Sequence, residues 1–190
     1  MKYPLIIILL CLLVGCQSKS SGLFYEIVNS NFINFTDTTA YHYGTFFPAP
    51  KDTPRYTSSS KEEFKVLVDT FFINSDKPVR SLIVELGNKG LTEFIDVVKK
   101  PQDNKQYTTI NLEKVSNTGR YSLTGTANVD IIDNDFVGAI SFGKPYVLKK
   151  KAIIIASIAS SPKAGRMVAF LLENKQDNWI IQDKIVLERW

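Results

Sequence analysis

The chain contains a single histidine, His42. Catalytic triads and Cys-His pairs need a histidine beside a nucleophile, and zinc sites usually combine several histidines or cysteines at set spacing. His42 stands between Tyr41 and Tyr43, with no nucleophile motif around it. The sequence therefore favours a packing or surface role for this histidine over a catalytic one.

An acidic cluster lies in the segment DIIDNDFVG. Carboxylate oxygens at this density are ligands that Ca²⁺ prefers. An EF-hand loop would need oxygen-bearing side chains at its next ligand positions, which hold Val137 and Lys144. We therefore interpret the cluster as a polar turn, because Asx residues favour such bends. Its members are Asp130, Asp133 and Asp135.

Consecutive lysines, Lys149 to Lys151, fall where we expect a hairpin turn. Near an anionic leaflet each lysine would add ~1 kcal/mol of attraction. The simpler interpretation, which we favour, is a solvated turn whose charges also protect the edge of the sheet.

Paired carboxylates such as Glu85 and Glu93 would suit glycoside hydrolysis only if they faced each other at a set separation. No motif in the sequence places such a pair. Neither Gly87 to Gly90 nor Gly138 to Gly143 matches a nucleotide-binding fingerprint. We therefore assign no catalytic, cofactor-binding or metal-ligating residue.

The N-terminal residues have the pattern of an export signal. Lys2 supplies a positive charge, and Pro4 to Val14 is an uninterrupted apolar run. Such a run matches the ~7–15 residues of a signal-peptide core and is shorter than the ~20 residues of a membrane-spanning helix. Leu13-Val14-Gly15-Cys16 resembles the lipobox of bacterial lipoproteins. The resemblance implies cleavage before Cys16, a diacylglycerol on its sulfur and acylation of its amine.

This interpretation divides the chain and limits its chemistry. We expect a signal peptide at residues 1–15, a lipidated cysteine with a short tether at 16–22, and one globular domain at 23–190. Cys11 would leave with the signal and Cys16 would become a thioether, so the mature domain would have neither a free thiol nor a disulfide. Several acyl chains give stable anchoring where a single chain would not.

The anchor predicts a place in the bacterial cell envelope. In the best-known sorting system an Asp after the lipidated cysteine retains a lipoprotein in the inner membrane, and this position holds Gln17. We therefore favour the outer membrane, facing the periplasm, over the inner membrane. The formal net charge of +4 comes from basic residues scattered among acidic ones, which does not argue for nucleic acid.

Hydrophobic spacing predicts helices in the first half of the chain. Leu23 to Phe35 and Leu91 to Lys99 each carry apolar residues along one helical face. A further helix is predicted from Ser60 to Phe72, because Ser60 and Glu63 form a capping box before an apolar periodic run. Residues 79–86 fit a strand or a helix, and the proline-rich residues 36–59 predict an extended segment.

From Tyr107 onward the residue types favour strands, joined by connections short enough for antiparallel hairpins. Ala152 to Ala159 is apolar on both faces, as expected of a covered central strand. In the last strand Trp179, Ile181, Ile185 and Leu187 share one parity, so we expect them on one face. The predicted strands are 107–115, 121–132, 137–148, 152–159, 166–173 and 178–189.

The C-terminal part, Phe136 to Trp190, resembles a diffuse group of exported bacterial proteins with no activity to transfer. It also resembles the last hairpin of NTF2-like cone folds. The residues that carry the first resemblance are Ile140, Phe142, Pro145, Lys151-Ala152, Phe170 to Glu173 and Trp179 to Ile181. We predict an α+β fold with N-terminal helices packed on a C-terminal antiparallel sheet, a meander; the alternative is an NTF2-like cone.

For function, the sequence favours a non-catalytic envelope lipoprotein that binds a protein or envelope ligand close to the membrane. The membrane itself would be a partner through the lipid on Cys16. One alternative is a small-ligand carrier, which predicts a large apolar cavity between helices and sheet. The other is an enzyme with an unrecognised carboxylate site, which predicts a pocket with at least two acids of shifted pKa.

Overall fold

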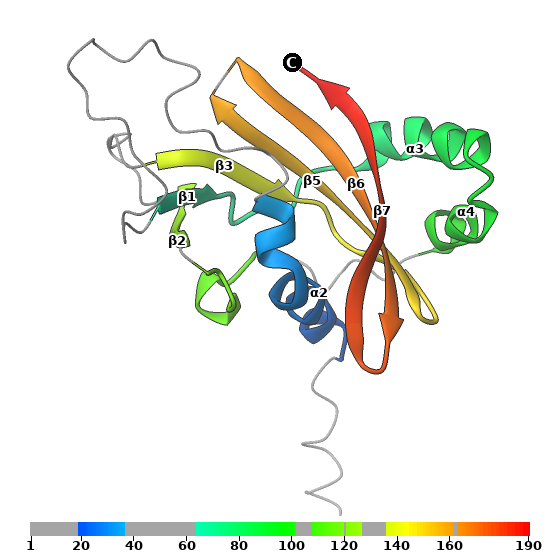
Figure 1. Ribbon diagram of the computed structural model, residues 1–190, viewed down its shortest axis with the longest axis horizontal. Helices are drawn as coiled ribbons and strands as arrows, with labels where there is room; N and C mark the ends of the chain where they lie inside the picture. The colour runs from blue at the N-terminus through cyan, green and yellow to red at the C-terminus, as the bar shows by residue number, and fades with distance from the viewer. Residues whose placement is uncertain (1–18, 37–63, 102–107, 120, 127–135, 162) are drawn as a thin grey trace, which may run out of the picture.

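A computed structural model describes residues 19–36, 64–101, 108–119, 121–126, 136–161 and 163–190. These residues form three α-helices, a short 3-10 helix and a seven-stranded sheet (Figure 1). The helices are α2 (Lys19–Thr36), α3 (Asp76–Asn88) and α4 (Thr92–Lys99), with the 3-10 helix η3 at Leu112–Lys114. The strands are β1 (Phe64–Val68), β2 (Tyr121–Gly125), β3 (Phe136–Phe142), β4 (Tyr146–Leu148), β5 (Lys151–Ser161), β6 (Ala164–Lys175) and β7 (Asn178–Arg189). The predicted α+β class is confirmed.

The sheet has the strand order β2-β1-β3-β5-β6-β7, and β4 pairs with β5 beside β3. Pairing is antiparallel from β3 through β7, as the short connections predicted. β1 pairs in parallel with both β2 and β3. The sheet is therefore mostly antiparallel, with one strand from the first half of the chain inserted into it.

Helices cover both faces of this sheet. On one face, α2 packs its apolar side over alternate residues of the central strands, such as Ile154 and Phe170. On the other face, α3 and α4 pack over the intervening residues, such as Ile155 and Leu171. The apolar character of residues 152–159 is explained, because both faces of β5 are covered. The fold is thus helices packed on a sheet rather than a cone around one cavity.

Aromatic rings fill the centre of the α2 face. Phe35 makes edge-to-face contacts with Phe142 and Phe170, with ring centroids 5.8 and 4.7 Å apart. Phe24 contacts Phe72 at 5.0 Å in the same geometry. Such pairs contribute about 0.5–1.5 kcal/mol beyond the area that they bury. These phenylalanines therefore hold α2 on the sheet.

The predicted helix at 60–72 is wrong where the structure describes it. Residues 64–68 form strand β1, whose Val66 and Val68 point into the core below α2. This segment carries a period of two as well as a helical period, and its valines favour a strand. Pairing on both sides, with β2 and β3, outweighs the local helical pattern. The capping box at residues 60–63 lies outside the described residues.

Helix α3 begins at Asp76, shortly after this segment. The Asn74 side chain accepts a hydrogen bond from the Asp76 backbone N–H at 2.9 Å, just where the helix starts. Pro78 stands in the first turn, where its missing N–H costs no intrahelical bond. Residues 79–86, which fitted a strand or a helix, are helical. The short helix predicted at 91–99 is confirmed as α4.

The strand predicted at 107–115 is also wrong in its described part. Thr109 forms an isolated bridge with Phe71, and Leu112–Lys114 is the 3-10 helix. The Asn111 side chain accepts a hydrogen bond from the Glu113 backbone N–H at 2.9 Å. This local bond offers the backbone an alternative to a strand ladder.

The last strand contains β-bulges that change which face its residues occupy. Leu172 pairs with Ile181 but Leu171 pairs with Asp183, so Gln182 is an extra residue. Before this bulge, Trp179 and Ile181 pack on the α2 side. After it, Ile185 and Leu187 pack on the α3–α4 side. The prediction that all four share one face is therefore wrong, because a bulge resets the parity of a strand.

Candidate functional site

An open groove of about 830 Å³ lies between the outer side of α2 and the beginning of β7. Polar and apolar residues share its lining, and most of the polar ones are asparagines. α2 contributes residues 29–34, the turn after η3 contributes Asn117, and β7 contributes residues 178–181 and Lys184. The groove thus brings together segments from both ends of the chain.

Asn31 fixes the helix to the strand at the floor of this groove. It is 4% exposed. Its amide nitrogen donates to the Trp179 carbonyl at 2.8 Å and to the Ile27 carbonyl at 3.1 Å. A buried amide with two acceptors is satisfied and costs little to bury. Asn31 is therefore a positioning residue.

Asn29 ties the turn after η3 to the same helix. Its side chain accepts from the Ser116 backbone N–H at 2.8 Å and donates to the Lys114 carbonyl at 3.1 Å. The Asn117 amide nitrogen in turn donates to the Asn29 carbonyl at 3.1 Å. Asn117 has a positive φ of 57°, a conformation that asparagine adopts more readily than most residues. The amide wall of the groove is thus built into the fold.

Lys184 places a cation on the groove. Its ammonium lies 5.6 Å from the centre of the Phe170 ring. Burial lowers the pKa of Lys184, and the nearby charge of Arg166 lowers it further. An ammonium in this setting gains from an anionic or strongly polar group that replaces its lost hydration.

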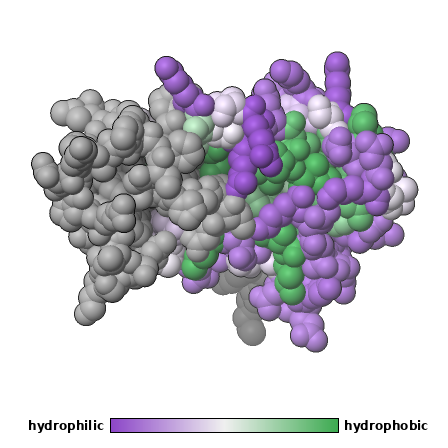
Figure 2. All heavy atoms as spheres, turned by 45° about the horizontal axis from the view of Figure 1, so that its top comes forward, coloured by the Kyte–Doolittle hydropathy of each residue, from purple (hydrophilic) through white to green (hydrophobic). Residues whose placement is uncertain are grey.

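Isoleucines supply apolar surface at the groove. Ile33 is 42% exposed and Ile180 is 44% exposed. Figure 2 shows apolar surface gathered near the middle of the described part and framed by hydrophilic side chains. Trp179 also lines the groove but is buried, and its indole N–H has no hydrogen-bond partner within the described part of the chain. The groove combines exposed apolar contacts with amide donors and acceptors, as recognition surfaces do.

Lys184 is the one ionisable side chain among the described residues that line the groove. No carboxylate or histidine is among its lining residues within the described chain. Its one hydroxyl, that of Ser30, donates to the Glu26 carbonyl at 2.8 Å, a bond inside the helix. General acid–base catalysis needs a proton-transferring side chain within hydrogen-bond reach of the reacting atom. The described groove residues therefore supply an ammonium and amides but no carboxylate or imidazole.

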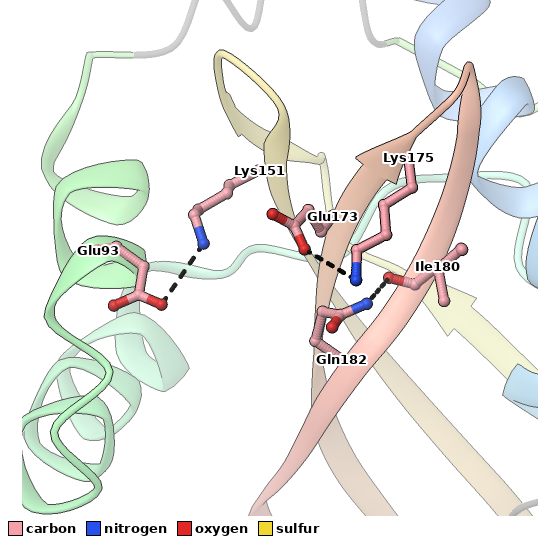
Figure 3. Close-up of polar contacts among 6 residues, drawn as sticks. All are labelled: Glu93, Lys151, Glu173, Lys175, Ile180 and Gln182. Carbon is pink, nitrogen blue, oxygen red and sulfur yellow. Dashed lines mark hydrogen bonds and ion pairs between the residues drawn. The ribbon is translucent and has the colours of Figure 1, made fainter.

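The residues singled out in the sequence lie elsewhere. Lys149 and Lys150 form the β4–β5 turn, as expected, and Lys151 begins β5. Lys151 lies 3.4 Å from the Glu93 carboxylate and 4.8 Å from the centre of the Phe94 ring. Figure 3 shows this pair bridging α4 and β5. Cys16, His42 and the aspartates Asp130, Asp133 and Asp135 lie outside the described residues.

The carboxylates Glu85 and Glu93 do not meet in the groove. Glu85 is exposed on α3, and Glu93 pairs with Lys151 in the first turn of α4. The hydrogen bond from its own backbone amide is the main cause that lowers the pKa of the Glu93 carboxyl; burial opposes it, and Lys151 lowers the pKa further. A lowered pKa suits a structural ion pair and not a general acid.

Sequence reasoning did not find the groove residues. Asn29, Asn31 and Asn34 recur within one predicted helix although asparagine is a poor helix former, and this recurrence was a visible signal. Their partner, Trp179, comes from the other end of the chain. Only the packing of α2 on β7 brings the two segments together.

Among the described residues, no group of three or more His, Cys, Asp or Glu side chains is placed to hold a metal ion. In the same part of the chain, no helix has the length and apolar character needed to cross a membrane. Comparison of the chain with protein-family models, curated proteins and solved structures finds no match.

Proposed function

We propose that this protein is a non-catalytic envelope lipoprotein, anchored through Cys16, that binds a protein or envelope ligand close to the membrane. The observation that carries the proposal is the groove between α2 and β7. Its lining offers amides, a cation and exposed isoleucines, without an acid or a histidine among the described residues. The lipobox supports the lipid anchor. Gln17, where an inner-membrane lipoprotein would carry an Asp, supports a place in the outer membrane, facing the periplasm.

The groove is suited to a partner larger than a small molecule. It is open to solvent, and its polar and apolar residues come from three different segments. A carrier would instead enclose an apolar ligand between helices and sheet. A peptide segment or an envelope polymer can lie across an open groove, contact the exposed isoleucines and place a polar or anionic group at Lys184.

A photo-crosslinking experiment tests the binding surface. A photoreactive amino acid is placed at Ile180 in the anchored protein, and the matched control carries it at Val84, which is 60% exposed on α3. We expect a defined crosslinked product in membranes from position 180 and none from position 84. A second comparison uses Ile180→Asp and Val84→Asp, of which only the first is expected to abolish binding of the crosslinked species.

Equal crosslinking from both positions would overturn the groove as the binding surface. Turnover of a substrate by the purified protein, lost on changing one polar groove residue, would overturn the non-catalytic assignment. The anchor is tested separately by metabolic labelling with a palmitate analogue. We expect incorporation in the native chain and none in Cys16→Ser; labelling of both chains, or of neither, would contradict it.

A further inference from the structure

We propose that the end of the domain formed by the β4–β5 and β6–β7 turns faces the membrane, where Lys149 and Lys150 contact anionic lipid headgroups. This inference rests on the proposed lipid anchor at Cys16. It goes further by assigning an orientation to the domain and a lipid class to its surface. Three observations carry it: the position where α2 begins, the joining of the two turns, and the pairing of the neighbouring charges.

The start of α2 brings the anchor to this end. The helix begins at Lys19, so Lys19 to Gly22, which we expected in the tether, form its first turn. Gln17 and Ser18 then separate Cys16 from the helix, a span of at most about 11 Å at ~3.3–3.6 Å per residue. In Figure 1 the beginning of α2 and both turns lie at the lower end of the molecule. A lipid at Cys16 therefore holds this end of the domain close to the bilayer.

The two turns form one projecting unit. The backbone N–H of Asn174 donates to the Lys150 carbonyl at 2.7 Å, and Lys151 pairs with Glu173 in the ladder between β5 and β6. Lys149 has a positive φ of 56°, which gives the tight reversal between β4 and β5. The lysines of this turn are thus held at a fixed position on the sheet.

Lys149 and Lys150 are the cations of the two turns that we expect to contact lipid. Lys151 is paired with Glu93, and Lys175 lies 3.4 Å from Glu173 (Figure 3). Both turn lysines are exposed and have no ion pair within the described part of the chain. Asp177, in the β6–β7 turn, opposes them with one negative charge. An anionic leaflet attracts such lysines, whereas a zwitterionic one does so far less.

The test uses the lipidated chain reconstituted in vesicles of phosphatidylcholine, with or without phosphatidylglycerol. A membrane-impermeant amine reagent is applied, and labelling of each lysine is measured by mass spectrometry. We expect phosphatidylglycerol to lower labelling of Lys149 and Lys150 by about five-fold, the equivalent of the attraction per lysine near such a surface. High salt is expected to restore it, because screening removes the attraction.

Lys163 is the internal control, because it lies at the opposite end of β5 and β6. Its labelling is expected to be the same in both vesicles. The lysine proposal is overturned if Lys149 and Lys150 respond to phosphatidylglycerol no more than Lys163 does. It is also overturned if phosphatidylglycerol lowers the labelling of Lys150 by the same factor in the Lys149→Glu chain as in the Lys163→Glu chain.

Failure of the anchor gives a different result. In that case the purified chain carries no lipid and does not float with phosphatidylcholine vesicles, which contradicts the proposed function. The lysines are then tested by co-sedimentation of the unlipidated chain with phosphatidylglycerol vesicles. Binding that is weakened by Lys149→Glu but not by Lys163→Glu supports a lipid-binding surface at Lys149 and Lys150. Equal binding of the wild type and both variants overturns it.

Discussion

The Lys89 ammonium nitrogen lies 2.9 Å from Oδ2 of Asp183, so an ion pair joins the residue after α3 to the edge strand β7. The other carboxylate oxygen of Asp183 accepts from the Lys184 backbone N–H at 2.7 Å. Asp183 follows the bulge at Gln182, where β7 changes the face that its side chains occupy. The ion pair therefore connects the α3–α4 layer to β7 next to its β-bulge.

Breaking this pair is expected to have a small effect that depends on pH. The side chains are 43% and 39% exposed, so Lys89→Ala should lower the free energy of unfolding by about 0.2–1 kcal/mol. The hydrogen bond from Lys89 is the main cause that lowers the pKa of Asp183. The stabilisation is therefore present above the unfolded pKa of about 3.9 and is lost as pH falls through the lower folded pKa.

Urea unfolding of the wild type, Lys89→Ala, Asp183→Asn and the double variant measures this coupling. At neutral pH we expect the double variant to lose less stability than the sum of the single losses. The difference should disappear in acid. Strict additivity at neutral pH would show that the two side chains do not interact.

Gly143 is expected to tolerate no side chain. A Cβ at this position would lie 2.5 Å from Ser75 Oγ and 3.2 Å from the Ile155 carbonyl oxygen. Gly143→Ala should therefore lower the free energy of unfolding by about 1–3 kcal/mol. The matched control is Gly87→Ala in α3, where no atom lies within 4 Å of the new Cβ. This change should raise stability by about 0.5–1 kcal/mol through helix propensity, and chemical denaturation checks both signs.

Tyr146 should make the fold sensitive to alkali. Burial raises the pKa of its phenol, and the negative charge of Asp76 raises it further. The unfolded phenol ionises near a pKa of about 10, so stability is complete below that value and is lost as pH rises towards the folded pKa. Comparison of denaturation midpoints at neutral and alkaline pH should therefore show a smaller alkaline loss in Tyr146→Phe than in the wild type. Equal losses in the two proteins would contradict this assignment.

The two faces of the sheet should unfold together. Ile154 and Ile155 are adjacent and fully buried, and they pack against opposite helical layers. Replacing either by Ala should cost about 2–5 kcal/mol through lost contacts and a cavity. Tryptophan fluorescence and circular dichroism should report one shared transition in each variant.

Val84→Ala, at a position 60% exposed, is the control and should change stability by less than about 0.5 kcal/mol. Separate transitions in Ile155→Ala would show that the α3–α4 layer unfolds on its own.

The sequence is a good guide to the fold where one local pattern decides the element. Leu23 to Phe35 lies within helix α2, and the apolar run at residues 152–159 lies within the doubly covered strand β5. The last hairpins follow from short polar connections, and positive φ at Gln176 and Asp177 forms the β6–β7 turn. In each case the local preference and the tertiary environment agree.

The sequence misleads where tertiary pairing decides. Residues 64–68 carry a helical period, but their place between two strands makes them β1. Likewise, parity along β7 depends on an extra residue, Gln182, whose effect appears only when the strand pairs with β6. The groove is of the same kind, because it exists only where α2 meets β7. None of these features can be predicted from a short segment of the sequence.

The insertion of β1 also has a consequence for how the chain folds. Only two residues separate β5 from β6 and β6 from β7, so these strands can pair within a short stretch of polypeptide. β1 instead needs distant partners, since Phe64 lies opposite Tyr121 and Val68 lies opposite Ile140. Closing such large loops costs entropy before the contacts stabilise them, which slows folding. The pairing of β1 with β2 and β3 is therefore expected to be the last and slowest step of folding. Until it occurs, the unpaired edge of β3 is the part of the sheet most exposed to aggregation.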